Sequence, residues 1–268
     1  MSRISETFGR LKKEKRKALV IFITAGDPSM KATVELVKAA HGAGADIVEI
    51  GVPFSDPVAD GPVIQESFHR AISNGASLVK TFEAVKKIRK ECGAPIAFML
   101  TCNLVIAHGT NKFMKNCAEA GVDGLILPDV PAEEADEFIP KASASGLDTV
   151  MLAAPTSTPH RMKKIASLAT GFVYYINVKG VTGKKAAVAA DAAKGIRAMK
   201  KLTRLPVLAG FGVTDPAQAK EMAKVSDGVI IGSQAIRVIK GAGSAKRAVE
   251  DLAKYVASVR RALDSIQA

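Results

Sequence analysis

The sequence contains little of what marks several common classes of protein. Its 268 residues include no tryptophan, only three tyrosines and only three cysteines, Cys92, Cys102 and Cys117. The cysteines have no metal-ligand spacing and do not make up an even-numbered disulfide framework. We therefore expect free thiols that pack as small apolar groups, a reducing compartment and no zinc site.

Several motifs that would carry a specific chemistry are also missing. No Walker loop and no serine-histidine-aspartate nucleophile motif occurs. The segment after the first apolar run, Thr24-Ala-Gly-Asp-Pro28, lacks the GxGxxG spacing of a dinucleotide-binding fold. The four histidines show no metal-ligand spacing, so we expect surface or packing roles for them and no metal site; they are His41, His69, His108 and His160.

Long apolar segments are absent as well. No run approaches the roughly 20 residues of a membrane-spanning helix. A basic stretch at 10–17 followed by the apolar run 18–24 imitates a secretory signal, but glutamates interrupt the basic part, and Asp27-Pro28 follows where small cleavage-site residues would be expected. We expect an amphipathic helix followed by a first strand, in a soluble, cytoplasmic chain with no membrane partner.

Negative charge is the scarcer sign, and the formal net charge is +12. Such an excess is compatible with binding to nucleic acid or to an acidic surface. The lysines, however, alternate with apolar positions at helical spacing in stretches such as 85–90 and 161–164, and few aromatic side chains are available to stack on bases. We interpret the charge as solvated helix faces and expect no nucleic-acid partner. Attraction of a phosphorylated substrate or an acidic partner stays open.

What is present is a regular alternation of eight apolar runs of strand length with amphipathic stretches of helix length. No low-complexity or serine-rich stretch interrupts it, so residues 1–268 are expected to form one domain. The pattern predicts an α/β fold, a single (β/α)8 TIM barrel with an extra N-terminal helix, rather than a doubly wound sheet. The expected strands are 18–24, 46–50, 95–101, 123–127, 148–153, 171–177, 205–209 and 227–231. The expected helices are 31–42, 62–73, 78–91, 111–120, 132–145, 159–168, 191–202, 215–224 and 244–264.

One of these strands ends on a carboxylate. Glu49 is the last acid of an otherwise apolar run, although a strand inside a parallel sheet should be apolar throughout. Asp60 follows eleven residues later in a proline-bounded loop and supplies a second carboxylate in different surroundings. Such a pair can run acid and base steps near neutral pH. Alternatively, Asp56 and Asp60 are ordinary loop acids that cap the next helix, whose first turn suits Pro62.

Glycine-containing loops follow the last three strands, where barrels commonly bind phosphate. They are Gly180-Val-Thr-Gly183, Ala209-Gly-Phe-Gly212 and Ile231-Gly232-Ser233. Backbone N–H groups and the start of a short extra helix, expected near 234–240, would hold the dianion, and plain tight turns are the alternative. The segment 180–191 is rich in small residues, and we expect it to close over the site as a lid.

These blocks together resemble the tryptophan synthase α-subunit family over nearly the whole chain. The resemblance rests on Phe22 with 24–28, the run 49–62, Asn103-Leu-Val105, Pro128-Asp129-Val-Pro131 and the three glycine loops. It implies cleavage of indole-3-glycerol phosphate to indole and glyceraldehyde 3-phosphate in tryptophan biosynthesis, a retro-aldol step that needs no cofactor in this chain.

The resemblance also implies roles for individual residues and a partner. Glu49 would be the acid/base and Asp60 would accept the indole N–H. The substrate-binding residues would be Phe22 on the apolar wall, Tyr174 near Glu49, and Gly183, Gly212, Gly232 and Ser233 around the phosphate. Thr182, in the expected lid, is placed with them as a residue that can hydrogen-bond an acid at the site. The expected partner is a β subunit that carries pyridoxal phosphate, in an α2β2 heterotetramer, with the loop 53–60 and the region of Asp129 facing it.

The chain departs from the family pattern at three places. Thr101 stands where many members have a tyrosine, Asn177-Val178 replaces a common Ser-Arg pair, and Lys184 replaces an arginine. Three other functions therefore stay open: a free-standing lyase that releases indole, another phosphate-binding barrel enzyme, and a regulatory subunit with little catalysis of its own.

Overall fold

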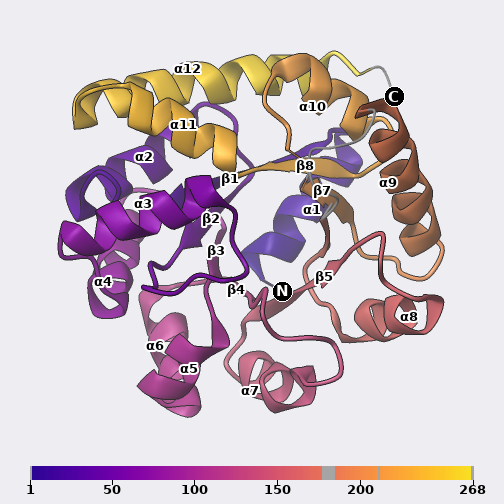
Figure 1. Ribbon diagram of the computed structural model, residues 1–268, viewed down its shortest axis with the longest axis horizontal. Helices are drawn as coiled ribbons and strands as arrows, with labels where there is room; N and C mark the ends of the chain where they lie inside the picture. The colour runs from indigo at the N-terminus through magenta and orange to yellow at the C-terminus, as the bar shows by residue number, and fades with distance from the viewer. Residues whose placement is uncertain (1, 177–184, 211, 267–268) are drawn as a thin grey trace.

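The computed structural model describes residues 2–176, 185–210 and 212–266. Its centre is a closed barrel of parallel strands in the order β1 to β8, surrounded by helices (Figure 1). The predicted TIM barrel is thus confirmed, and each predicted strand overlaps an observed one, whereas the extent of the domain, residues 1–268, stays a prediction. The strands are β1 (Ala18–Thr24), β2 (Ile47–Gly51), β3 (Ile96–Met99), β4 (Gly124–Ile126), β5 (Asp148–Ala153), β6 (Val173–Ile176), β7 (Val207–Gly210) and β8 (Gly228–Ile231).

The strands are apolar because both of their faces are covered. All seven residues of β1 are buried. Successive side chains of a strand point to opposite faces, so Ala18 and Val20 join the cluster inside the barrel, and Leu19 and Ile21 pack in the cluster between the barrel and its helices. The surrounding helices are α2 (Met30–Gly42), α3 (Pro62–Ser73), α4 (Leu78–Arg89), α6 (Thr110–Ala120), α8 (Pro159–Leu168), α9 (Lys185–Lys200), α10 (Pro216–Ala223), α11 (Ser233–Gly241) and α12 (Ala245–Asp264).

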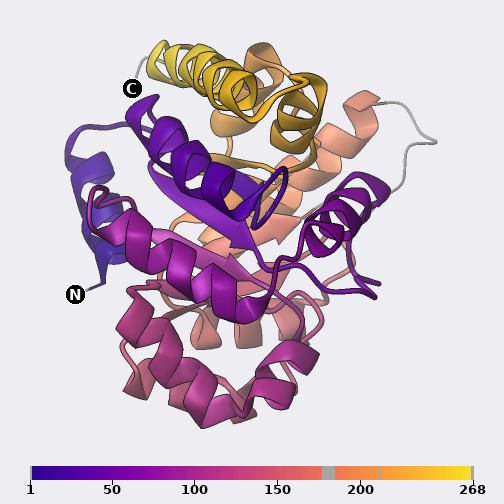
Figure 2. The same cartoon turned by 90° about the vertical axis from the view of Figure 1, so that its left-hand side faces the viewer.

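The extra N-terminal helix, α1 (Arg3–Lys13), covers the end of the barrel at which the strands begin. Its Ile4 is fully buried in the interior cluster, and the ring centroid of Phe8 lies 5.8 Å from that of Phe172. In the side view, α1 and the loop between β2 and α3 lie at opposite ends of the molecule (Figure 2). The helix therefore closes one end of the barrel and leaves the carboxyl ends of the strands open for a site.

Polar side chains at the closed end satisfy backbone groups that the barrel leaves unpaired. A polar residue lies just before each even-numbered strand. Its side chain accepts a hydrogen bond from a backbone N–H near the start of the neighbouring odd-numbered strand, the one that comes earlier in the sequence. A buried N–H without a partner would be costly, so these acceptors stabilise the strand starts. The four bonds are Leu19 N to Asp46 (2.9 Å), Ile96 N to Asp123 (2.8 Å), Thr149 N to Thr170 (2.7 Å) and Val207 N to Asp227 (2.9 Å).

Three helix predictions were wrong in detail. The expected helix 132–145 is instead a 3-10 turn, η1 (Ala135–Glu137), followed by the short α7 (Ile139–Ala144), because Pro140 lacks an N–H and fits only the first turn of a helix. A short helix that was not predicted, α5 (Cys102–His108), precedes α6 and is separated from it by Gly109 at φ 87°. Helix α9 starts at Lys185 rather than 191, since its alanine-rich beginning favours helix.

Helix α11 occupies the position of the predicted extra helix after the eighth strand. No helix in the described part of the chain is long and apolar enough to cross a membrane. The beginning of the expected lid, residues 180–184, lies outside the described residues.

Candidate active site

The candidate site is the last layer of side chains inside the barrel, at the carboxyl ends of the strands. Val20, Ile47, Phe172 and Leu208 all belong to the apolar interior cluster. Because side chains on a strand alternate between faces, the residue two positions further along each strand also points inward. That layer contains Phe22, Glu49, Tyr174 and Gly210.

Glu49 is the one acid of this layer. It lies within β2 and pairs in register with Phe22 of β1 and Ala97 of β3. The strand continues two residues beyond Glu49 and ends at Gly51, one residue after the end predicted for it. Its side chain is 0% exposed, and neither carboxyl oxygen has a hydrogen-bond partner among the residues that the structure describes. Burial raises the pKa of Glu49 to about 8. The group therefore holds a proton near neutral pH and has no structural contact that explains its presence.

Asp60 is the second carboxylate of the site and lies in the loop between β2 and α3. Burial and the nearby charge of Asp129 raise the pKa of Asp60 to about 6. Burial, together with the charges of Glu49 and Asp60, raises the pKa of the Tyr174 phenol well above the ordinary value, so Tyr174 lies within range of both acids. The site thus brings together three residues that are far apart in the sequence.

The alternative reading of the loop acids as helix caps is wrong. Helix α3 begins at Pro62 as expected, but its N-cap is Gly61 and no side chain makes a capping hydrogen bond there. The backbone carbonyl of Asp60 accepts a hydrogen bond from Gln65 Nε2 at 2.8 Å, which anchors the loop to the helix. The carboxyl group of Asp60 is thereby left for another use.

Glycines let two aromatic rings enter this layer. A Cβ on Gly51 would lie 2.3 Å from Cζ of Phe22, and a Cβ on Gly210 would lie 2.0 Å from Cε2 of Tyr174. No ordinary side chain fits at either position. The glycines therefore set where the Phe22 and Tyr174 rings stand in this layer.

The expected phosphate loops lie at the same end of the barrel. Gly232 is the N-cap of α11 and Ser233 is its first residue. A Cβ on Gly232 would meet only Phe22 Cβ and Ile64 Cδ1, at 3.8 and 3.9 Å, so the backbone there is open to a ligand. Gly212 is exposed, with φ 44° in the left-handed region. A helix N-terminus with free N–H groups favours an anion. Thr182 and Gly183 lie outside the described residues.

A comparison with known protein families identifies the family to which this barrel belongs. The family described as "Tryptophan synthase alpha chain" matches residues 8–264. The chain belongs to that family. It is therefore the subunit type that cleaves indole-3-glycerol phosphate, a carbon–carbon lyase of tryptophan biosynthesis.

Known tryptophan synthase alpha chains resemble this one in sequence and in structure. The alpha chain of Geotalea daltonii is 47% identical over 237 residues, which cover 88% of this chain and 90% of the relative, and that of Geobacter sulfurreducens is 44% identical over 98% and 99%. A crystal structure of tryptophan synthase subunit alpha from Legionella pneumophila superposes with a TM-score of 0.92 at 35% identity, covering 99% of this chain and 100% of that one. A crystal structure of the tryptophan synthase complex from Pyrococcus furiosus gives 0.83 at 34% identity, covering 91% and 98%.

The structure brings the charge of Asp129, which the family resemblance placed toward the partner, close to Asp60, and it buries Thr101 just after β3. Asp129, after β4, raises the pKa of Asp60 and accepts the N–H of Cys102 at 3.0 and 3.1 Å. Thr101 is buried, and its hydroxyl has no hydrogen-bond partner within residues 2–176, 185–210 and 212–266. Position was the available signal, because both residues follow the end of a strand in a barrel.

The cysteines and histidines stay outside the chemistry of this alpha chain. All three cysteines are free, but only Cys117 is buried and the other two are half-buried, so the expected burial is confirmed for one of them. Burial and Asp129 raise the pKa of Cys102 to about 11, which keeps it a thiol. No group of three metal-binding side chains occurs among the described residues.

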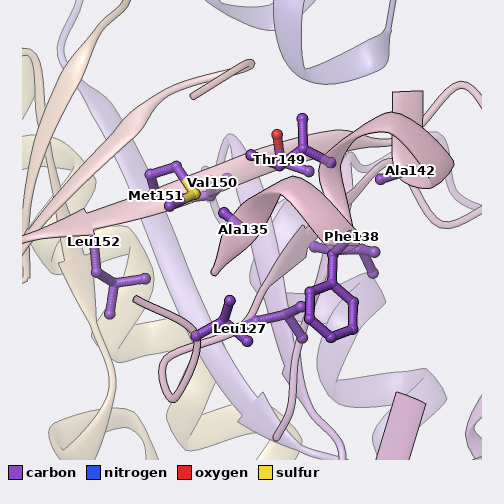
Figure 3. A pocket seen from close by; sticks show the side chains of 11 residues that line it. Leu127, Ala135, Phe138, Ala142, Thr149, Val150, Met151 and Leu152 are labelled. Atoms are coloured by element: carbon purple, nitrogen blue, oxygen red, sulfur yellow. The ribbon is translucent and has the colours of Figure 1, made fainter. Parts of the chain in front are cut away.

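A separate apolar pocket lies between β4, β5 and α7 (Figure 3). Its volume is about 30 Å³, and Leu127, Phe138 and Met151 are among its lining residues. Neither carboxylate of the site lines it. The pocket holds about one or two water molecules by volume and is too small for an indole ring, so it is a packing void.

The contact between Phe22 and Gly51 predicts a binding defect. In Gly51→Ala, the new methyl group must displace the Phe22 ring, and we expect KM for indole-3-glycerol phosphate to rise about tenfold or more, since one misplaced apolar group costs about that much in a pocket. Steady-state cleavage kinetics test this. Gly93→Ala is the control, because its Cβ meets nothing within 4 Å. An unchanged KM would show that the Phe22 ring does not contact the substrate.

Proposed function

We propose that Glu49 and Asp60 carry the retro-aldol cleavage of indole-3-glycerol phosphate. Glu49 protonates C3 of the indole ring, and the glycerol hydroxyl next to that carbon then loses its proton to the same carboxylate. The carbon–carbon bond breaks with its electron pair returning to the ring, which releases indole and glyceraldehyde 3-phosphate. Asp60 accepts the ring N–H, where positive charge develops after C3 is protonated.

The observation that carries the proposal is the state of Glu49. A buried carboxyl with a pKa of about 8 and no hydrogen-bond partner in the described part of the chain costs stability and has no role in packing. It is, however, suited to give and take a proton near neutral pH. Tyr174 faces this acid from β6, and Phe22 stands beside it on β1 as one wall of the indole pocket.

The phosphate of the substrate binds, in this proposal, at the ends of the last strands. Backbone N–H groups at Gly212 and Gly232 and the hydroxyl of Ser233 hold the dianion at the start of α11. Thr182 and Gly183 are included on the family resemblance, as are the lid and its closure. The phosphate then fixes the substrate so that its indole ring points toward Phe22 and Glu49.

The chain works, in this proposal, with a tryptophan synthase β subunit in an α2β2 heterotetramer in the cytoplasm. The resolved tryptophan synthase complex of a relative supports such an assembly. The loop 53–60 and the region of Asp129 face the partner. Pyridoxal phosphate belongs to the β subunit, and the α-chain reaction needs no cofactor, because proton transfers alone complete it.

The two shifted pKa values predict the pH dependence of the cleavage. Asp60 must be ionised to accept the indole N–H, and Glu49 must be protonated to act as the acid. We expect kcat/KM to rise as the pH passes about 6 and to fall as it passes about 8. Initial rates between pH 5 and 9.5 test this. Asp60→Asn should remove the rise at low pH, and an unaltered profile in that variant would contradict its role.

Release of indole from indole-3-glycerol phosphate, measured with the purified chain alone and with a β subunit, tests the proposal. Slow cleavage alone and fast cleavage with the β subunit support it. Fast cleavage alone would favour a free-standing lyase. Activation of β-subunit turnover without any cleavage would identify a regulatory subunit.

A further inference from the structure

A groove with a volume of about 660 Å³ lies at the closed end of the barrel, remote from the candidate active site. One side of the groove is formed by α1 and the segment that leads into β1, and the other side by the segment between α9 and β7. Residues that follow α10 and α12 complete the lining. Figure 2 shows α1 at the end of the molecule opposite the β2–α3 loop. The volume is in the range of small-molecule sites, which hold about 300–1,000 Å³.

The lining of this groove is strongly cationic. Seven lysine and arginine side chains line it, against one acid, Asp227, which is already paired with Lys200 at 2.6 Å. Four of the cations, Lys12, Lys15, Lys17 and Arg204, form no ion pair with a described residue. The acids at its rim, Glu14, Asp264 and Glu221, pair with Arg16 and Lys224. A concentration of unpaired positive charge in a concave surface attracts multiply charged anions.

Helix ends explain only part of this charge. Cations are favourable in the last turn of a helix, which accounts for Lys12 in α1 and Lys200 in α9. Lys15, Lys17 and Arg204 lie between elements, where no helix end requires them. Lys17 is half-buried and donates to the carbonyl of Ser226 at 2.8 Å, and burial together with the charge of Lys200 lowers its pKa.

Lys15 occupies a position at which glycine is the favoured residue. Its φ is 53°, and it is the one non-glycine residue of the described chain with a positive φ. The backbone N–H of Lys15 donates to the carbonyl of Lys12, and the N–H of Arg16 donates to the carbonyl of Leu11. This pair of hydrogen bonds is the pattern of a Schellman motif at the end of a helix. A side chain there costs backbone energy that glycine would avoid. The long cationic side chain at this position therefore has a use that the turn itself does not provide.

Apolar residues form the floor between these charges. Phe8, Leu205, Pro206 and Ile266 line the groove and are partly exposed. A floor of this kind beside a cationic rim matches an anion that carries both a flat ring and a chain of phosphates. We propose that the groove binds a nucleoside polyphosphate, with the phosphates on Lys12, Lys15, Lys17 and Arg204 and the base on the apolar floor.

Isothermal titration calorimetry of the full chain with ATP, inorganic tripolyphosphate and AMP, in low salt with EDTA, tests this assignment. We expect ATP to bind most tightly, tripolyphosphate more weakly because it leaves the floor unused, and AMP at least about tenfold more weakly than ATP because two phosphates are missing. Glycerol 3-phosphate, which competes for the active-site phosphate loops, should leave ATP binding unchanged relative to KCl at the same ionic strength. Competition by glycerol 3-phosphate would overturn the assignment to the groove.

Variants separate the groove from the net charge of the protein. The triple variant Lys12→Gln, Lys15→Gly, Arg204→Gln should weaken ATP binding by about tenfold for each cation removed. The matched control is the triple variant Lys86→Gln, Lys115→Gln, Lys163→Gln, which removes the same charge from exposed positions elsewhere. It should change the affinity for ATP by less than about twofold. Equal weakening in both variants, or no ATP binding by the wild-type chain, would overturn the proposal.

The single variant Lys15→Gly distinguishes a ligand-binding lysine from a structural one. Because glycine fits the left-handed conformation, Lys15→Gly should raise Tm while weakening ATP binding about tenfold. A merely structural lysine would change Tm without changing the affinity, and that result would remove Lys15 from the site. Indole release should stay at the wild-type rate, since the groove and the active site lie at opposite ends of the barrel.

Discussion

Replacing Glu49 with glutamine is expected to lower the rate of indole release by about 10²- to 10⁴-fold, the usual contribution of a general acid/base. Glutamine has nearly the same shape, so the barrel and the phosphate loops keep their geometry. It cannot supply or accept the proton at indole C3. Normal turnover in Glu49→Gln would remove Glu49 from the mechanism.

The same substitution is expected to stabilise the protein at neutral pH. Native Glu49 keeps its proton up to a pKa of about 8, whereas the unfolded chain loses it near the ordinary value of 4.5. Between these values the native state binds more protons than the unfolded state, so the stability of the wild type falls as the pH rises. At pH 7 the cost is roughly 3 kcal/mol, and glutamine, which does not titrate, avoids it.

Urea unfolding at two pH values tests this expectation. Glu49→Gln should unfold at a higher urea concentration than the wild type at pH 8, and the difference should vanish near pH 4, where both states of the wild type are protonated. A gain that persists at pH 4 would mean that packing rather than titration is responsible. The combined result, lost activity with gained stability, is what a functional acid in an unfavourable place produces.

Replacing Asp123 with alanine is expected to destabilise the protein by about 3–5 kcal/mol, the usual cost of breaking a buried ion pair. Asp123 is 4% exposed and precedes β4 at the closed end of the barrel. Its carboxylate accepts hydrogen bonds from Arg89 at 2.6 Å, from the N–H of Ile96 at 2.8 Å and from Arg3 at 2.7 Å. Alanine leaves the largely buried Arg89 without its counter-charge and the N–H of Ile96 without an acceptor.

Urea unfolding of Asp123→Ala checks this loss, and Glu119→Ala is the control. Glu119 is also an acid with a cationic partner, Lys115, but it is 52% exposed, and exposed pairs contribute little. The folded fraction of Asp123→Ala should still cleave indole-3-glycerol phosphate at the wild-type kcat, because Asp123 lies at the end of the barrel remote from Glu49. A loss no larger than that of Glu119→Ala would show that other contacts hold this end together.

Much of the fold could be predicted because the elements are locally encoded. An apolar run such as 18–24 is buried on both faces, which only a strand inside a covered parallel sheet requires. The errors occurred where local signals conflict. Pro140 interrupts an otherwise helical pattern, and the alanines at the start of α9 looked like loop because no apolar period runs through them.

The candidate site was only partly readable from the sequence. Glu49 could be found because it is a charged residue in an apolar strand, and Asp60 because the family block contains it. Asp129 also stands in a family block, but the resemblance placed it toward the partner, and Thr101 fell inside the predicted strand 95–101. That the charge of Asp129 reaches Asp60 depends on β3 and β4 following β2 in the closed barrel.

By itself the sequence determined the (β/α)8 alternation, the family and the two carboxylates, because apolar periodicity and residue type are local properties of the chain. Only the tertiary structure decided that Glu49 is fully buried with no hydrogen-bond partner among the described residues, that Tyr174 lies within range of the charges of Glu49 and Asp60, and that α1 and the segments beside it form a cationic groove at the opposite end. Burial, hydrogen bonding and the resulting pKa values depend on neighbours brought together by barrel closure, and the spacing of residues along the chain does not contain them.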